Sequence, residues 1–322
     1  MNEAIHIAKN AFLECLREPA VLVVFLTTAL VNAVLPITAL FVFREQFRMI
    51  VDNSMATMLL GGIAVSVFAA NAVLSREIEF GTAALIFSKP VSRSQYIIGK
   101  IFGVCGTMLV YGFCASLQLL ICLRCALDQF RLDWVVYSLM VVMTMVLPYV
   151  LAALRNYLKH SNFCQNALLA LPFCVGLCAM ITQFMPVKNA KDLGLNFHVG
   201  EGVLVLCMGL VFMGVVGVVC ATRLRLSGAL IASFSLFMLG AMADYIFGLS
   251  ASGGSLFAMT SQALVPNWQS FWQAEALSSG VEIPGEYIWM SLVYMLSLSC
   301  VFGALACLLF ETRELDGKGS VS

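Results

Sequence analysis

The sequence alternates between long apolar stretches and short polar segments. Eight apolar stretches reach about 20 residues or more, the length that a helix needs to cross the roughly 30 Å hydrocarbon core of a bilayer. They occupy residues 20–43, 54–74, 97–123, 135–154, 164–184, 202–222, 226–249 and 287–310. The pattern therefore predicts an all-α fold, a polytopic membrane helix bundle with about eight transmembrane helices.

Residues 2–18 carry too many charges to cross a bilayer, but their apolar positions recur with the period of an amphipathic helix. The apolar face holds Ile5, Ala8, Phe12 and Leu16, and the charged positions opposite are Glu3, Lys9 and Glu14. We expect residues 1–19 to form a cytoplasmic amphipathic helix at the membrane interface, with Pro19 beginning the first span. A cleaved signal peptide is not expected, because the apolar run from Ala20 is too long for a signal core.

Composition agrees with this fold class. Hydrophobic residues make up 61% of 322 positions and charged residues 11%, less than half of the roughly 25% usual in soluble domains. Mean hydropathy is +0.94. No soluble domain stands out, so we expect a transmembrane domain over residues 20–310, a cytoplasmic segment at 75–100 within it, and a cytoplasmic tail at 311–322.

The chain carries no net charge, with 18 basic and 18 acidic residues, which gives no indication of a nucleic-acid partner. Twelve lysines and arginines fall in segments on the side of the N-terminus and six on the other side. The positive-inside rule therefore predicts that both termini are cytoplasmic. The four tryptophans, Trp134, Trp268, Trp272 and Trp289, then lie near the outer interface, which indole rings favour.

Within the long outer loop, Trp268, Phe271 and Trp272 recur at helical spacing. This spacing predicts a short helix on or in the outer leaflet. It could cover a substrate exit, or it could simply anchor the loop in the membrane, and the sequence favours the anchor.

The motifs of a membrane enzyme are missing. The three histidines, His6, His160 and His198, form no HExxH pattern, and there is no GxSxG sequence. Most of the 12 cysteines lie in apolar runs, and the pair Cys122 and Cys125 has no second pair to complete a zinc site. Gly99 and Lys100 lack the upstream glycine of a phosphate loop. We therefore expect no catalytic residue, metal or cofactor in this chain.

Asp244 is the one acid well inside a predicted span, and charges within the membrane are often functional. It lies some sixteen residues from the inner end of that span, or roughly 24 Å at 1.5 Å per residue, near the outer interface. A solvated or hydrogen-bonded carboxylate is therefore favoured over a proton or substrate relay.

The connection between the second and third spans, residues 77–100, has an unusual composition for a loop. We predict a short helix that begins with the acids Glu77 and Glu79, as the helix dipole favours, and ends before Pro90. Its apolar residues are Leu85, Ile86 and Phe87, and the basic residues Lys89, Arg93 and Lys100 follow at its far side. Gly99 and Gly103 then form a small-xxx-small pair that permits close helix packing.

This segment has two interpretations. A solvated cytoplasmic loop would satisfy the positive-inside rule but would leave the apolar side chains without a packing partner. A docking site for another protein would bury them.

The order of Glu79, Gly81, Thr82, Pro90, Arg93, Gly99 and Lys100 resembles the signature of export-type ATP-binding-cassette permeases of the type-2 class. That signature is an acid, then GT, then P-x-x-R, then GK. The amino-terminal elbow helix and the outer region before the last span are similar as well. The resemblance implies that a separate ATPase subunit binds ATP and docks on Glu77, Glu79, Gly81, Thr82, Leu85, Pro90 and Arg93. It also implies a permease homodimer or heterodimer. The family commonly has six spans per subunit instead of eight.

We therefore expect the membrane-spanning permease subunit of an ATP-driven exporter in the plasma membrane, which in a bacterium is the inner membrane. An ion-driven secondary transporter is the alternative, and Asp244 would be its candidate charge. A membrane enzyme is the weakest alternative because catalytic groups are missing. The transported substrate stays open.

Overall fold

The computed structural model describes residues 2–43, 45–79, 92–128, 131–185, 195, 198–248 and 265–312. In the first half the elements are α1 (Asn2–Arg17), α2 (Pro19–Ala39), α3 (Gln46–Ala70), the π-helical turn η1 (Asn71–Ser75), α4 (Arg76–Glu79), α6 (Arg93–Cys125), β1 (Ala126–Asp128) and β2 (Arg131–Leu132). In the second half they are α7 (Trp134–Val141), π-helical η2 (Val142–Val146), α8 (Leu147–Lys159), α9 (Phe163–Phe184), α10 (His198–Arg223), α11 (Leu226–Ala241), π-helical η3 (Asp244–Gly248), 3-10 helical η4 (Trp268–Phe271), α14 (Ala274–Ser278) and α15 (Gly285–Glu311).

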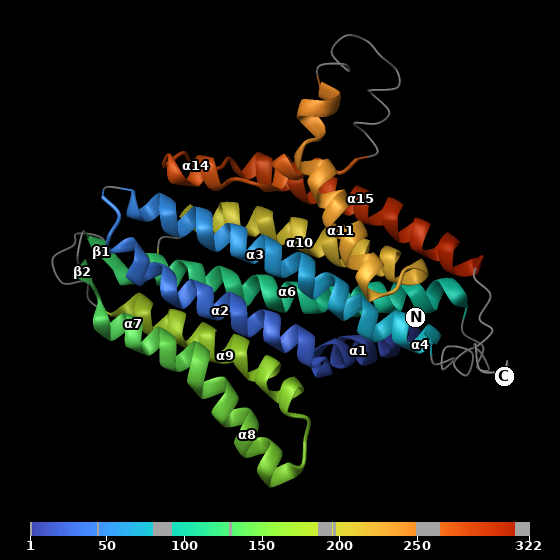
Figure 1. Ribbon diagram of the computed structural model, residues 1–322, viewed down its shortest axis with the longest axis horizontal. Coiled ribbons are helices and arrows are strands. Elements are labelled where there is room, and N and C mark those ends of the chain that lie inside the picture. Colours follow the sequence, from blue (N-terminus) through green and yellow to red (C-terminus); the bar gives the residue numbers. More distant parts are fainter. Residues whose placement is uncertain are drawn as a thin grey trace.

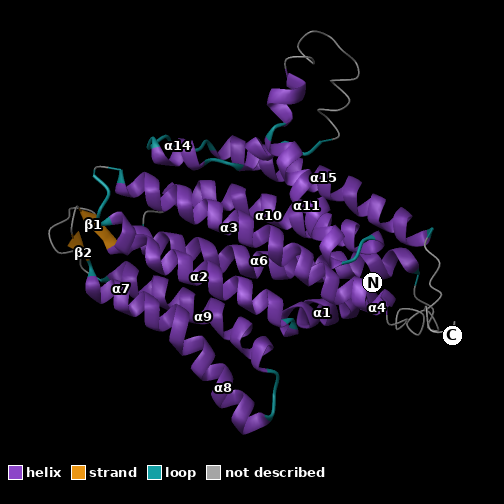
Figure 2. Ribbon diagram, in the orientation of Figure 1, coloured by secondary structure: helices purple, strands orange, loops and turns teal. Residues whose placement is uncertain are grey.

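The chain is all-α apart from one small hairpin of β1 and β2, as Figure 2 shows. Seven helical segments among the described residues are long and apolar enough to cross a membrane. They are Pro19–Ala39, Gln46–Ser75, Arg93–Cys125, Trp134–Lys159, Phe163–Phe184, His198–Arg223 and Gly285–Glu311. The all-α membrane bundle predicted from the apolar stretches is therefore confirmed, with seven such segments where eight were expected.

The difference lies in the predicted span 226–249, which is divided. Its first part, α11, has 16 residues, which at 1.5 Å per residue cover about 24 Å and fall short of a full crossing. Helix α11 ends at Ala241, with Met242 as its C-cap, and the π-helical turn η3 begins at Asp244. The apolar run is thus longer than the straight helix that it forms.

Helix α6 lies at the centre of the bundle and packs against α1, α2, α3, α9, α10 and α15 (Figure 1). Small residues permit close packing of α3 against α10, because a Cβ added at Gly217 would lie 2.7 Å from the carbonyl oxygen of Ser66. Likewise a Cβ at Gly62 would lie 2.3 Å from Leu210 Cδ2. Such close contacts favour association of helices in lipid, where the hydrophobic effect between helices is weak.

The predicted amphipathic helix at the N-terminus is present as α1, and it packs against α6 and α9. Ala11, Cys15 and Leu16 are buried, whereas Ile5 at the other end of the apolar face is exposed. Of the four residues on the predicted apolar face, Leu16 is therefore buried, Ala8 and Phe12 are partly buried and Ile5 is exposed. The position of α1 at a membrane interface stays a prediction.

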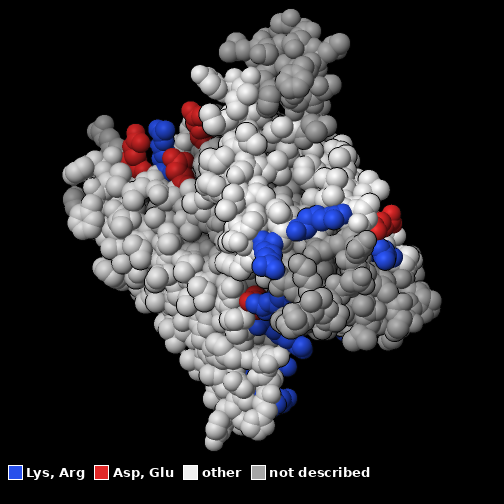
Figure 3. Space-filling view, turned by 45° about the vertical axis from the view of Figure 1, so that its right-hand side comes forward, with Lys and Arg blue, Asp and Glu red and all other residues white. Residues whose placement is uncertain are grey.

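The two ends of the bundle differ in charge. We call the end that holds α1, α4, the start of α6 and the end of α15 the basic end (Figures 1 and 3). Among side chains that the structure describes there, nine are basic, namely Lys9, Arg17, Arg76, Arg93, Lys100, Arg155, Lys159, Arg223 and Arg225. Four are acidic, namely Glu14, Glu18, Glu77 and Glu311. This excess is what the positive-inside rule associates with a cytoplasmic surface.

The short helix predicted around Trp268 is present as the 3-10 helix η4. Both Trp268, which is 3% exposed, and Phe271 are buried in protein, and their position relative to the outer leaflet stays a prediction. The physical reason for their burial is space left by distant glycines: a Cβ at Gly240 would lie 2.4 Å from Trp268 Cδ1, and one at Gly209 would lie 3.0 Å from Phe271 Cγ. A pocket of about 290 Å³ remains beside these rings, with the partly exposed Trp272 in its wall.

Candidate functional site at the basic end of the bundle

An ion-pair network surrounds Lys100 where α1, α4 and α6 meet. The side chain of Lys100 is buried, and its Nζ lies 2.8 Å from Glu77 Oε1 and 3.4 Å from Glu14 Oε2. The Tyr96 hydroxyl donates a hydrogen bond to the other carboxylate oxygen of Glu77. The ammonium group also lies 5.4 Å from the centroid of the Tyr96 ring. A buried ammonium needs such partners because its desolvation is costly.

A second ion pair ties α4 to the junction of α1 and α2. Both terminal nitrogens of Arg76 contact the carboxylate of Glu18, at 2.5 and 3.0 Å, in the bidentate geometry of strong guanidinium–carboxylate pairs. Glu18 is only 8% exposed and precedes the first residue of α2. Because Glu18 joins α1 to α2, this pair fixes the start of α4 to both helices.

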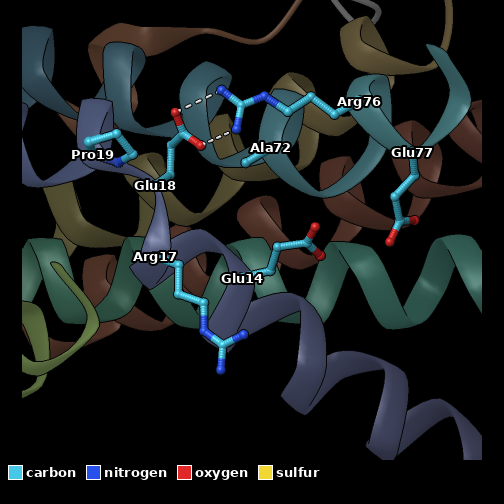
Figure 4. Close-up of a pocket in the computed structure, with 7 residues that line it drawn as sticks. All are labelled: Glu14, Arg17, Glu18, Pro19, Ala72, Arg76 and Glu77. Carbon is cyan, nitrogen blue, oxygen red and sulfur yellow. Dashed lines mark hydrogen bonds and ion pairs between the residues drawn. The ribbon is translucent and has the colours of Figure 1, made fainter. Parts of the chain in front are cut away.

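Between the two ion pairs is a hollow of about 380 Å³. It is lined by Glu14, Arg17, Glu18, Pro19, Ala72, Arg76 and Glu77. Figure 4 shows Arg76 facing Glu18, with the carboxylates of Glu14 and Glu77 in the space between α1 and α4. Burial raises the pKa of the Glu14 carboxyl above its ordinary value; Lys100 lowers this pKa and Glu77 raises it by smaller amounts.

Further contacts extend the network to α9 and α15. Arg17 Nε donates to Gln165 Oε1 on α9 at 2.9 Å. Arg93, the first residue of α6, donates from Nη1 to the backbone carbonyl of Glu311 at 2.9 Å. The Tyr96 ring stacks on Phe310 with centroids 5.6 Å apart. The residues on either side of segment 80–91 therefore contact the first and last of the seven apolar segments, and Arg17 connects α1 to the fifth.

The two glycines of the small-xxx-small pair lie directly beneath α1. A Cβ added at Gly99 would lie 2.7 Å from Ile7 Cγ2, and one at Gly103 would lie 2.5 Å from Ala11 Cβ. Real side chains essentially never approach so closely. Both positions thus allow α1 to lie against α6, close enough for Glu14 to reach Lys100.

The structure brings together only part of the predicted docking segment. Glu77 and Arg93 are described with their side chains, and Glu79 ends α4 with a side chain outside the described part. Gly81, Thr82, Leu85 and Pro90 also lie outside the described residues.

The prediction that Glu77 and Glu79 begin a helix is wrong, because α4 continues α3 and η1 without a break. No helix-breaking residue separates Ala70 from Glu79, and Ser75 is bound to the Ala221 carbonyl of α10 at 3.1 Å. The helix dipole disfavours acids near a helix C-terminus. The Lys100 ammonium offsets this effect at Glu77.

Sequence reasoning missed four residues of the network, namely Glu14, Glu18, Arg76 and Tyr96. One signal was available, because Tyr96 and Lys100 are four residues apart and so share one helical face. The pairing of Glu18 with Arg76 joins residues 58 positions apart, which no local pattern reports.

Asp244 lies in η3 and is held by a hydrogen bond. The Nδ2 atom of Asn267 donates to both of its carboxylate oxygens at 2.9 Å. Asn267 also accepts from the backbone N–H of Gln269, as the N-cap of η4. This geometry describes a structural tie between η3 and η4.

The described residues contain no group of three histidine, cysteine, aspartate or glutamate side chains that could hold a metal ion. In the CxxC pair, the Cys122 thiol donates to the Asn32 carbonyl oxygen at 3.0 Å in the core.

Seven apolar helical segments and the charge difference between the two ends define a multi-pass α-helical membrane protein. Comparison with protein-family models and with curated proteins gives no match.

Proposed function

We propose that this chain is the membrane-spanning permease subunit of an ATP-driven exporter and that a separate ATPase subunit docks on the segment between α4 and α6. The observation that carries the proposal is the buried Glu77–Lys100 pair at 2.8 Å. Its two residues flank residues 78–99, which hold six of the seven residues that resemble the family signature. A force on that segment therefore acts on α4 and α6 together.

The network gives this force a path into the bundle. Displacing α4 from α6 would separate Glu77 from Lys100, and breaking a buried pair costs about 3–5 kcal/mol. Moving the joined ends as one body costs less. Through Glu18 such a motion reaches α2, and through the contacts of Arg93 and Tyr96 it reaches α15. ATP-driven closure of the partner would in this way tilt several spans around a transport pathway in a permease dimer.

The alternative, a secondary transporter driven by an ion gradient, finds less support among the described residues. A mechanism that carries its ion on a charged side chain needs that side chain near the middle of the membrane. Lys100 lies within two to three turns of the start of α6, and Arg124 lies in its last turn. Asp244 belongs to a short turn that Asn267 ties to η4.

Purification of a tagged chain from its native membranes tests the proposal. We expect ATP hydrolysis to copurify with the wild-type chain and to be lost from Glu79→Lys and Leu85→Asp variants that still insert at normal levels. Glu45→Lys is the control, because Glu45 lies at the opposite end of the bundle with an exposed side chain. A wild-type chain without copurifying hydrolysis, or one that binds ATP tightly by itself, would contradict the proposal.

A further inference from the structure

The α8–α9 hairpin encloses a groove that the proposed function does not use. The two helices pack against each other, and α8 leaves the bundle toward its C-terminal end (Figure 1). The π-helical turn η2 and Pro148 lie where α8 begins, and such features are common causes of helix bends. The resulting groove has a volume of about 560 Å³.

The lining of the groove changes from apolar to basic along its length. It consists of Leu151, Ala152, Leu154, Arg155, Leu158, Lys159, Asn166, Leu169, Ala170 and Phe173. On α8, Leu151, Arg155 and Lys159 follow one another at intervals of four residues and so share one helical face. On α9, Asn166 lies nearest the hairpin and Phe173 lies two turns deeper. The polar groups of both helices thus gather at the basic end of the bundle, and apolar side chains line the remainder.

The two cations of the groove have no acidic partner in the described part of the chain. No ion pair of Arg155 or Lys159 exists there, whereas Lys100, Arg76 and Arg124 each have a carboxylate within 4.0 Å. Asn166 is already used, since its Nδ2 donates to Ser161 Oγ at 2.6 Å. The positive charge at the mouth of the groove is therefore available to an anion.

The apolar part of the groove opens to the surroundings of the bundle. Phe173 is 78% exposed, and Leu154 and Leu158 are also exposed. In a multi-pass membrane protein such side chains face acyl chains. An occupant that matches the whole groove has one anionic head beside the cations and an extended apolar tail.

We propose that the groove between α8 and α9 binds one phospholipid with an anionic headgroup, with its phosphate at Arg155 and Lys159 and an acyl chain along Leu151, Leu154 and Phe173. Basic pockets between helices on the cytoplasmic side are recognised sites for anionic lipid headgroups. The proposal is independent of the ATPase partner, because it needs only a membrane and these two helices.

Native mass spectrometry of the delipidated full chain tests this proposal. Phosphatidylglycerol and phosphatidylcholine with identical acyl chains are titrated separately, and inorganic phosphate is added in a third series. We expect the wild-type chain to prefer phosphatidylglycerol by about tenfold or more, since two basic residues attract its net negative headgroup and not the neutral one of phosphatidylcholine. The Arg155→Gln/Lys159→Gln variant should lose this preference. Excess phosphate should not displace the lipid.

A matched control removes the same charge elsewhere at the basic end, in a Lys9→Gln/Arg225→Gln variant, which should keep the preference. A second variant, Ala170→Trp, fills the apolar part and should weaken binding of both lipids by a similar factor. The melting temperature shows whether the Arg155→Gln/Lys159→Gln variant is folded. If it is not, Ala170→Trp still tests the proposal.

The proposal is overturned if the wild-type chain shows no preference, if the control loses it equally, or if Ala170→Trp binds both lipids normally. Full displacement by phosphate would indicate a simple anion site instead. The Arg155→Gln/Lys159→Gln variant could instead bind lipid normally and lose a copurifying ATPase. That result would show that the two basic residues bind a protein partner, and it would overturn the proposed lipid site.

Discussion

Replacing Glu77 by alanine should destabilise the bundle, because it removes the nearest counter-ion of Lys100. Lys100 is 4% exposed, and its ammonium would keep only Glu14, at 3.4 Å. The Tyr96 hydroxyl would lose its acceptor as well. Truncating one member of a buried pair costs about 3–5 kcal/mol. Since Glu14 offsets part of this loss, we expect roughly 2–4 kcal/mol.

The measurement is the melting temperature of the purified chain in detergent or nanodiscs. A loss of this size should lower it by roughly 5 °C or more. Glu45→Ala is the matched control, because the Glu45–Arg48 pair is exposed at 3.8 Å and such pairs contribute about 0–1 kcal/mol. Adding Lys100→Met to Glu77→Ala should restore part of the loss, since the buried ammonium is then gone and the Glu14 carboxylate that remains is partly exposed.

Equal melting temperatures for Glu77→Ala and Glu45→Ala would refute this reasoning. So would a double variant that is less stable than Glu77→Ala alone. Either result would mean that the burial of Lys100 does not depend on Glu77 as its counter-ion.

Three further outcomes are expected. Gly103→Ala should lower the melting temperature by an amount equivalent to about 1–3 kcal/mol, because its new Cβ would overlap α1. Gly176→Ala is the control and should leave the melting temperature unchanged, because no atom lies within 4 Å of its new Cβ. Equal effects of the two substitutions would contradict the packing of α1 on α6. Asp244→Asn should retain transport in reconstituted vesicles if this residue is a structural tie, and abolished transport would favour an ion-driven mechanism. A cytoplasmic reporter should be active when fused after Arg155 and inactive near Glu275, and the reverse would invert the topology.

Much of the bundle could be predicted because lipid imposes a simple rule on sequence. An apolar run of about 20 residues has the length of a membrane-spanning helix, in which all backbone groups are satisfied within the segment. The spans at Pro19–Ala39 and Phe163–Phe184 lie close to their predicted bounds for this reason. The same rule overestimated 226–249, because an apolar run does not report where a helix changes to a π-helical turn.

Features made by contacts between distant segments were not predictable. The burial of Trp268 depends on Gly240, whose missing side chain leaves room for the indole ring. The amphipathic pattern of α1 was readable, yet its partner could equally have been lipid or protein. The close approach of α1 to α6 depends on Gly99 and Gly103 together, as the small-xxx-small spacing indicated.

Only the part of the candidate site that lies on α4 and α6 could be predicted from the sequence. Glu77 and Lys100 belong to the segment that sequence analysis selected, and 23 positions separate them. Their environment comes from α1 and α15, which contribute Glu14 and Phe310. A sequence pattern reports which residues are charged, whereas pairing depends on how helices pack.

Photo-crosslinking from position 85 tests the central claim most directly. A photoreactive amino acid is placed there in the native host, and a second one replaces Val281, an exposed residue beyond α14 near the opposite end of the bundle. The account predicts that position 85 alone forms an adduct with a protein that contains a phosphate-loop sequence and hydrolyses ATP. Absence of such an adduct from position 85, or its equal formation from position 281, would contradict docking of an ATPase on this segment.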